Sequence, residues 1–220
     1  MAAERRRRRR MVLAGVLATV FGIAMSGARA QPSPTDFAVA VANDRVEEVK
    51  RLLAAGADPN TVDRNGDPVL VVAVRAGSAA TMDLLLAARA DVNARNRYGD
   101  TALMVASLSG RGDLVRKLRA RGAELNQKGW TALIYAATGG HDEIVRYLLA
   151  EGADIDAASP NGTTALMMAV RERRSSTLDL LIARGADVNH RNESGASALD
   201  WARQGKDTAV VVRLQRAGAR

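Results

Sequence analysis

Acidic side chains at a regular spacing are the first residues in this sequence that could do chemistry. Asp58, Asp91, Asp154 and Asp187 each close an apolar run, and Glu124 holds the corresponding place in a fifth run. Carboxylates act as general acids and bases when two of them converge on one bond. A single acid recurring at one phase of a repeat is instead typical of turns, which Asp favours. We interpret these acids as turn residues.

The two histidines, His141 and His190, are the next candidates. They fall at different phases of the repeat, His141 between two helices and His190 near a loop tip, whereas a zinc site needs three or four convergent ligands. The chain has no cysteine, so disulfides and thiolate chemistry are absent. No glycine-rich phosphate loop follows a strand. We therefore expect no catalytic, cofactor-binding or metal-binding residues and no cofactor, with an enzyme or small-molecule binder kept as a remote alternative.

Two independent landmarks share one period. The first is a Gly-Ala-Asp-like tripeptide, whose alanines are Ala57, Ala90, Ala123, Ala153 and Ala186. The second is a leucine, at Leu70, Leu103, Leu133, Leu166 and Leu199. Both series repeat every 33 residues with one interval of 30. A shared period of this length indicates stacked supersecondary units that present a surface.

Each unit reads as two helices followed by a polar finger. A hydroxyl residue precedes the first helix and can cap it, as at Thr101, Thr131, Thr164 and Ser197. Leu103 and Ala106 are three apart and share a helical face. A glycine ends the second helix, at Gly56, Gly122, Gly152 and Gly185. Arg89 stands where the second unit should have this glycine, and the finger at 126–129 is three residues short.

The Thr-Ala-Leu segments beginning at Thr101, Thr131 and Thr164, together with the Gly-Ala-Asp turns, resemble the ankyrin-repeat family over residues 36–220. The resemblance implies an all-α solenoid of about six helix-turn-helix units with short β-turn fingers and no continuous sheet. The expected repeats are about 36–64, 65–97, 98–127, 128–160, 161–193 and 194–220.

The first thirty residues have the organisation of a secretory signal peptide. The arginine run 5–10 precedes the apolar stretch 11–25 and the small-x-small site 28–30. We expect cleavage after Ala30, a linker at 31–35 and export, with the periplasm as destination. A secreted protein and an uncleaved N-terminal anchor are the alternatives. Arg8 and Arg9 leave open whether the general or the twin-arginine route is used.

The positive charge belongs mostly to this leader. The whole chain carries a net charge of +8, but residues 1–30 contribute seven arginines and one acid. The remaining 25 basic and 23 acidic groups leave a net charge of only +2. We therefore expect no nucleic-acid partner, contact with a membrane only transiently through the signal peptide, and a monomer.

The resemblance also implies how partners are held, namely by finger tips and variable positions of the first helices on the concave face. The candidate partner-binding residues are Arg64, Arg75, Arg97, Tyr98, Leu108, Lys128, Trp130, Thr138 and Arg171. We expect Tyr98, Leu108 and Trp130 at the exposed centre, with Arg75, Arg97 and Lys128 as a basic margin. Packing of Trp130 over the short finger is the alternative. Tyr135 and Trp201 are expected in the core.

The sequence thus favours an exported protein that binds another protein and has no catalysis of its own. It is also similar to small exported bacterial ankyrin-repeat proteins. Some of these are linked with catalase and oxidative-stress defence, so an accessory role in periplasmic oxidative-stress defence is the alternative function.

Overall fold

The computed structural model describes residues 32–220; the expected signal peptide and the start of the linker lie outside this range. Within it the chain forms twelve α-helices in six pairs. The inner helices, first in each pair, are α1 (Pro34–Ala42), α3 (Val69–Ala76), α5 (Ala102–Leu108), α7 (Ala132–Gly139), α9 (Ala165–Arg171) and α11 (Ala198–Gln204). The outer helices are α2 (Val46–Ala54), α4 (Ala79–Ala87), α6 (Gly112–Ala120), α8 (Asp142–Ala150), α10 (Ser175–Ala183) and α12 (Thr208–Arg216). None of these helices is long and apolar enough to cross a membrane.

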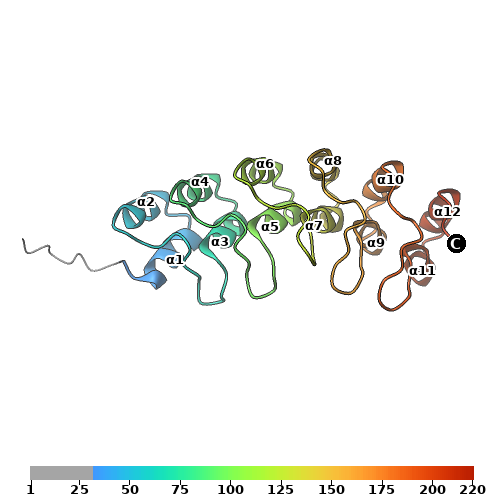
Figure 1. The fold of residues 1–220 in the computed structure, drawn as a ribbon, viewed down its shortest axis with the longest axis horizontal. Coiled ribbons are helices and arrows are strands. Elements are labelled where there is room, and N and C mark those ends of the chain that lie inside the picture. Colours follow the sequence, from blue (N-terminus) through green and yellow to red (C-terminus); the bar gives the residue numbers. More distant parts are fainter. Residues whose placement is uncertain (1–31) are drawn as a thin grey trace, which may run out of the picture. The chain divides into compact units, whose positions relative to one another are not determined.

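Figure 1 shows the inner helices in one row, the outer helices in a second row, and the fingers extending from the inner row on the side away from the outer helices. We number the fingers one to five, at residues 58–68, 91–101, 124–131, 154–164 and 187–197. The described part contains no strand, only isolated bridges in fingers one and five. Finger three is visibly the shortest. The prediction of an all-α solenoid of six helix pairs is confirmed.

The predicted caps start the inner helices. The Thr101 hydroxyl accepts a hydrogen bond from the backbone N–H of Met104, and Thr131, Thr164 and Ser197 cap α7, α9 and α11 in the same way. Helix α1 begins at Pro34, inside the segment expected to be linker. The reason is local, because Ser33 caps the helix and proline is well suited to its first position.

The outer helices end at the Gly-Ala-Asp-like tripeptides, as the sequence predicts. Gly56, Gly122, Gly152 and Gly185 all have φ between 86° and 95°, the left-handed region that costs glycine little. Arg89 takes the same place with φ 68°. A residue with a Cβ is disfavoured in this conformation by about 1–2 kcal/mol, so Arg89 adopts it at a cost in stability.

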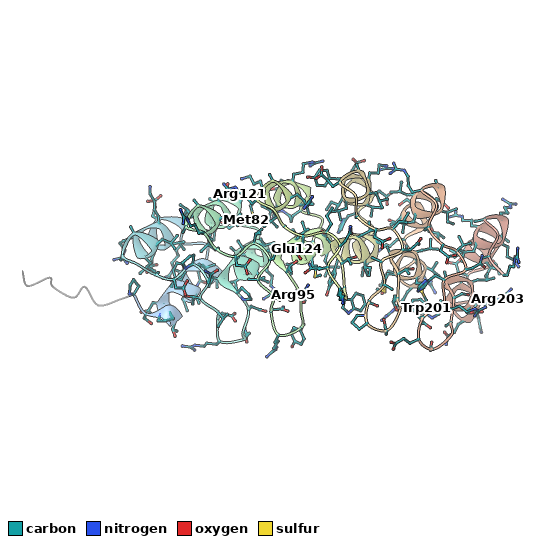
Figure 2. All side chains as sticks on the ribbon, viewed as in Figure 1. Met82, Arg95, Arg121, Glu124, Trp201 and Arg203 are labelled. Carbon is teal, nitrogen blue, oxygen red and sulfur yellow. The ribbon has the colours of Figure 1, made fainter. Side chains whose placement is uncertain are left out.

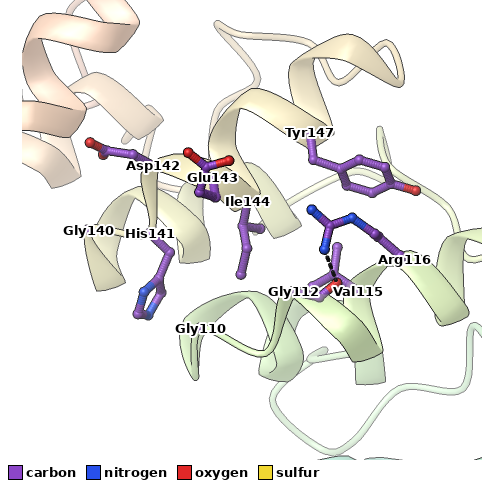
Figure 3. A pocket seen from close by; sticks show the side chains of 10 residues that line it. All are labelled: Gly110, Gly112, Val115, Arg116, Gly140, His141, Asp142, Glu143, Ile144 and Tyr147. Atoms are coloured by element: carbon purple, nitrogen blue, oxygen red, sulfur yellow. Dashed lines mark hydrogen bonds between the residues drawn. The ribbon is translucent and has the colours of Figure 1, made fainter.

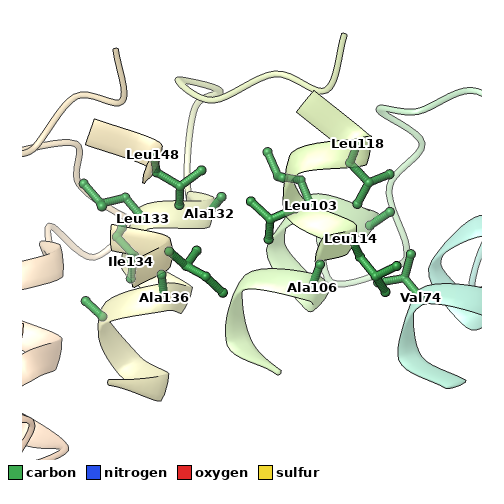
Figure 4. Close-up of a cluster of buried hydrophobic side chains, with 14 of the residues drawn as sticks. Val74, Leu103, Ala106, Leu114, Leu118, Ala132, Leu133, Ile134, Ala136 and Leu148 are labelled. Carbon is green, nitrogen blue, oxygen red and sulfur yellow. The ribbon is translucent and has the colours of Figure 1, made fainter. Parts of the chain in front are cut away.

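The core runs continuously through the array because each helix pair buries one apolar face against the next. Leu103, Ala106 and Leu133 are at most 2% exposed. Figure 4 shows them among Leu114 and Leu148 of the outer helices, gathered between consecutive repeats. Residues 31–220 form one compact unit, and all the buried apolar residues of the described core belong to it.

A ladder of hydrogen bonds to side-chain oxygens, four of asparagine and one of aspartate, joins the repeats at the base of the fingers. Asn60 accepts a hydrogen bond from the backbone N–H of Asp91 in the next repeat, at 2.8 Å. The equivalent acceptors are Asn93, Asn126, Asp156 and Asn189. The turn acids Asp58, Asp91, Asp154 and Asp187 in turn accept the N–H two residues on, which confirms their assignment to turns.

Candidate partner-binding surface

The surface formed by the inner helices and the five fingers, here called the finger face, carries most of the exposed apolar side chains. In residues 32–220 the large apolar residues with exposed side chains are Val39, Val62, Tyr98, Leu108 and Val212. All but Val212 belong to inner helices or fingers. Exposed apolar groups gathered on one face mark an interaction surface more strongly than scattered ones do.

Finger two presents Tyr98 from a rigid turn. The Asn96 side-chain oxygen accepts the backbone N–H groups of Tyr98 and Asp100, both at 2.9 Å. Tyr98 is 68% exposed, the highest value among the large apolar residues. The Arg97 guanidinium lies 4.7 Å from the centre of its ring and donates to its hydroxyl. The finger therefore holds an aromatic and a cation together in a fixed arrangement before any partner arrives.

Contrary to the expectation from the sequence, Trp130 is not exposed. Its indole is half-buried against the core, and its ring packs edge-on to Tyr135 with centroids 5.9 Å apart. The expectation of an exposed Trp130 is therefore wrong, and the alternative, packing at the short finger, describes the buried part of its ring. Finger three is short and keeps its tip near the helices, so its tryptophan meets the inner helix α7. One part of the indole packs against the core, and the rest is exposed on the finger face.

Tyr135 and Trp201 are also half-buried rather than fully in the core. The Tyr135 hydroxyl donates to the carboxylate of Asp100, which belongs to finger two of the preceding repeat. Burial and this hydrogen bond raise the pKa of Tyr135, because the neutral phenol is the form that can donate. Trp130, Tyr135 and Asp100 thus join finger two to finger three.

Arg75 is engaged within the protein. Its Nη1 lies 2.6 Å from Oδ2 of Asp67, a carboxylate buried at the root of finger one. Burial would raise the pKa of Asp67, but the hydrogen bond and charge of Arg75, with smaller contributions from Asn96 and Arg97, outweigh it and hold the pKa below its ordinary value. Arg75 is exposed as predicted, and its guanidinium is paired with a carboxylate of its own repeat.

The remaining candidates lie along the inner helices and fingers. Leu108 ends α5 with its side chain 41% exposed, and the Thr138 hydroxyl donates to the carbonyl of Ile134. Arg171 ends α9 and lies 3.6 Å from Glu172. Arg64 and Lys128 are exposed on fingers one and three.

Two grooves on the finger face were not anticipated. One, of about 430 Å³, lies between α1 and finger one and includes Val39 and Val62. The other, of about 440 Å³, lies between α9 and α11 and is lined by Arg171, Trp201 and Gln204. Figure 2 places Trp201 at the C-terminal end of the array. A comparison of equivalent positions in the repeats could have identified Val62 as an unusual apolar residue, because fingers two and five have Arg95 and Arg191 at that position.

The outer side of the array has a smaller cavity, of about 290 Å³, between α6 and α8. Figure 3 shows Arg116 beside Tyr147 on one side of it and His141 on the other. The Arg116 guanidinium lies 5.5 Å from the centre of the Tyr147 ring. Gly112 and Ile144 belong to the lining as well.

His141 contacts the backbone of the preceding repeat, and His190 of finger five contacts the backbone of finger four. His141 Nε2 lies 2.9 Å from the carbonyl of Leu108, and His190 Nε2 lies 2.9 Å from that of Gly162. At the position of His141, Arg111 and Arg174 make equivalent contacts to Gly77 and Thr138. His141 therefore joins two adjoining repeats, and His190 joins two adjoining fingers. Across residues 32–220 no group of three or more potential metal ligands occurs.

Comparison with known proteins agrees with the repeat architecture. A family model described as ankyrin repeats (3 copies) matches residues 37–128 and matches again at residues 121–192. No curated protein matches the chain.

Proposed function

The chain belongs to the ankyrin-repeat family, and from this premise we propose that it is exported and binds another protein through its finger face. Ankyrin repeats generally serve as protein-binding modules, and repeat arrays act through the extended surfaces they present. We infer no catalytic role for the chain. The recurrent turn acids accept backbone N–H groups, and both histidines contact backbone carbonyls.

The observation that carries this proposal is where the exposed apolar residues lie. Val39, Val62, Tyr98 and Leu108 follow one another along the finger face over the first three repeats. Protein interfaces are centred on aromatic and apolar anchors with arginine beside them, and Tyr98 with Arg97 has this composition. The outer helices expose a single large apolar residue among those described, Val212.

Export and a periplasmic location are the second part of the proposal. They are supported by the arginine run 5–10, the apolar stretch 11–25 and the site at Ala30. Amino-terminal sequencing of the protein from an extracytoplasmic fraction should begin at Gln31. Recovery of the full-length chain from the cytoplasm alone would contradict export.

Affinity capture tests the binding surface. Residues 31–220 would be used as bait, with Tyr98→Ala and Leu108→Ala on the finger face and Lys50→Ala and Arg184→Ala on the outer face. We expect one protein to be captured by the wild type and by both outer-face variants, and to be reduced with the finger-face variants. Equal capture by all four variants would refute the finger face as the binding surface.

The same experiment addresses the accessory role in oxidative-stress defence. A captured catalase would bring haem absorbance with it, and a captured protein without haem would oppose that alternative.

A further inference from the structure

We propose that finger one carries a site of spontaneous covalent modification, at which Asn65 loses its side-chain amide as ammonia and becomes aspartate or isoaspartate. The inference goes beyond the proposed function, because the reaction needs no partner protein. It is carried by the sequence at the tip of finger one and by the different packing of a second finger that shares this sequence.

The chain contains two Asn-Gly pairs, Asn65-Gly66 and Asn161-Gly162, at equivalent places in fingers one and four. Asparagine loses its amide most readily before glycine, because a glycine without a Cβ leaves its backbone nitrogen unhindered and its backbone free to turn. Gly66 and Gly162 have nearly the same φ, 79° and 76°. The N–H of each donates to the backbone carbonyl three residues earlier, at 3.0 and 2.8 Å. The two tips therefore share both a sequence and a turn.

The reaction requires only the finger itself and water. The backbone nitrogen of Gly66 attacks the side-chain carbonyl carbon of Asn65, and the new N–C bond closes a succinimide ring. The bond from that carbon to the amide nitrogen breaks, and ammonia leaves with the proton that the Gly66 nitrogen gives up. Water then opens the ring at one of its two carbonyl carbons, which yields aspartate or isoaspartate. No group is oxidised or reduced.

The tip of finger one is free to make this rearrangement. Asn65 is exposed, and apart from its chain neighbours no atom of residues 32–220 lies within 4 Å of the place that a Cβ on Gly66 would take. Within the same range, the hydrogen bonds of Asn65 and Gly66 all go to Asp63, a residue of the same turn. The tip can therefore open locally without releasing a hydrogen bond to another finger.

The tip of finger four is held by finger five. The backbone N–H of Glu193 donates to the carbonyl of Asn161 at 3.0 Å, and His190 Nε2 lies 2.9 Å from the carbonyl of Gly162. A Cβ on Gly162 would lie 2.9 Å from the Cα of Asn192, so the two fingers are in close contact. Closing the succinimide ring rotates the Asn-Gly peptide, and at finger four this rotation would have to break these contacts. Finger five should thus protect Asn161, whereas Asn65 lacks such a neighbour among the described residues.

The modified residue would lie on the finger face. Asn65 follows the candidate binding residue Arg64, and with Val62 it lines the groove between α1 and finger one. Aspartate would add a negative charge to this groove. Isoaspartate would add the same charge and would also lengthen the main chain of the finger by a methylene group. Either product would change the surface that finger one presents.

The test follows both Asn-Gly pairs in one sample. Residues 31–220, the compact unit, are kept in a mildly alkaline buffer and digested at intervals, and mass spectrometry gives the deamidated fraction at each asparagine. We expect Asn65 to react about two- to tenfold faster than Asn161, the effect of one additional hydrogen bond that must open first. The same measurement in guanidinium chloride is the reference, because the two rates should become comparable once the chain is unfolded.

Substitutions identify the residues responsible. Asn65→Gln should suppress the loss of ammonia at position 65 and leave the rate at Asn161 unchanged. His190→Ala removes one contact between fingers four and five and should speed the reaction of Asn161 without affecting Asn65. The matched control is His141→Ala, which removes the other histidine and should alter neither rate.

Three results would overturn the inference. The first is an unmodified Asn65 in the folded protein. The second is a ratio of the two rates that is the same in the folded and the unfolded chain, since the packing of the fingers would then have no influence. The third is an equal effect of His190→Ala and His141→Ala on Asn161, because finger five would then give no protection.

Discussion

Replacing Asp156 by asparagine should stabilise the repeat array. At four of the five rungs of the ladder between fingers the acceptor is asparagine, and at the fourth rung it is Asp156. Asn126 shows what the amide adds, because its Nδ2 also donates to the carbonyl of Gly152 at 2.9 Å. A carboxylate has no such donor. Asp156 also places its negative charge at the backbone N–H of Asp187, another acid.

The expected gain follows from one hydrogen bond. An intramolecular hydrogen bond contributes a net of about 0.5–1.5 kcal/mol, and for a chain of this size about 1 kcal/mol raises the melting temperature by about 2–4 °C. Urea unfolding and calorimetry of residues 31–220 would measure both quantities. The matched control is the reverse change, Asn126→Asp, which should destabilise the array by a similar amount.

The prediction fails if Asp156→Asn leaves the free energy of unfolding unchanged or lowers it while Asn126→Asp is destabilising. That pair of results would mean that the fourth rung does not have the geometry of the third. If neither change has an effect, the amide donors of the ladder contribute nothing and the reasoning is refuted.

Three further predictions concern the fold. Leu133→Ala should cost about 2–5 kcal/mol in urea unfolding, since Leu133 is 2% exposed; a loss below about 0.5 kcal/mol would mean that the core is wrongly assigned. Arg89→Gly should raise the free energy of unfolding by about 0.5–1 kcal/mol by relieving the left-handed arginine, and a decrease would contradict this explanation. Because the pKa of Asp67 is lowered in the folded state, its ionised carboxylate stabilises the fold at neutral pH, and this stabilisation is lost as pH falls below about 4. Asp67→Asn should therefore flatten the dependence of the urea midpoint on pH in that range. An unchanged slope would rule out this contribution.

The helix pairs could be predicted from the sequence because their determinants are local and repeat. Thr101 caps a helix that begins one residue later, Leu103 and Ala106 share a face by helical spacing, and Gly122 takes a conformation that few other residues tolerate. Each inference needs only a few neighbouring residues. The period then confirms it several times in one chain.

The finger face could be predicted only in outline, because its side chains are placed by neighbouring repeats. Tyr135 meets Asp100 from the preceding repeat, and even within one repeat Arg75 meets Asp67 from eight residues away, at the root of a finger. Trp130 is half-buried because finger three is short, which makes its ring meet Tyr135. The sequence identified which positions face the fingers but did not show which charges are already paired.

The most direct test of the central claim is site-specific photo-crosslinking in the organism that makes the protein. A photoreactive phenylalanine analogue would replace Tyr98 on finger two in one strain and Arg121 at the end of α6 in another (Figure 2 shows Arg121 on the outer side). We predict a covalent adduct with one protein from position 98 and none with that protein from position 121. Adducts with the same protein from both positions, or from position 121 alone, would contradict binding through the finger face.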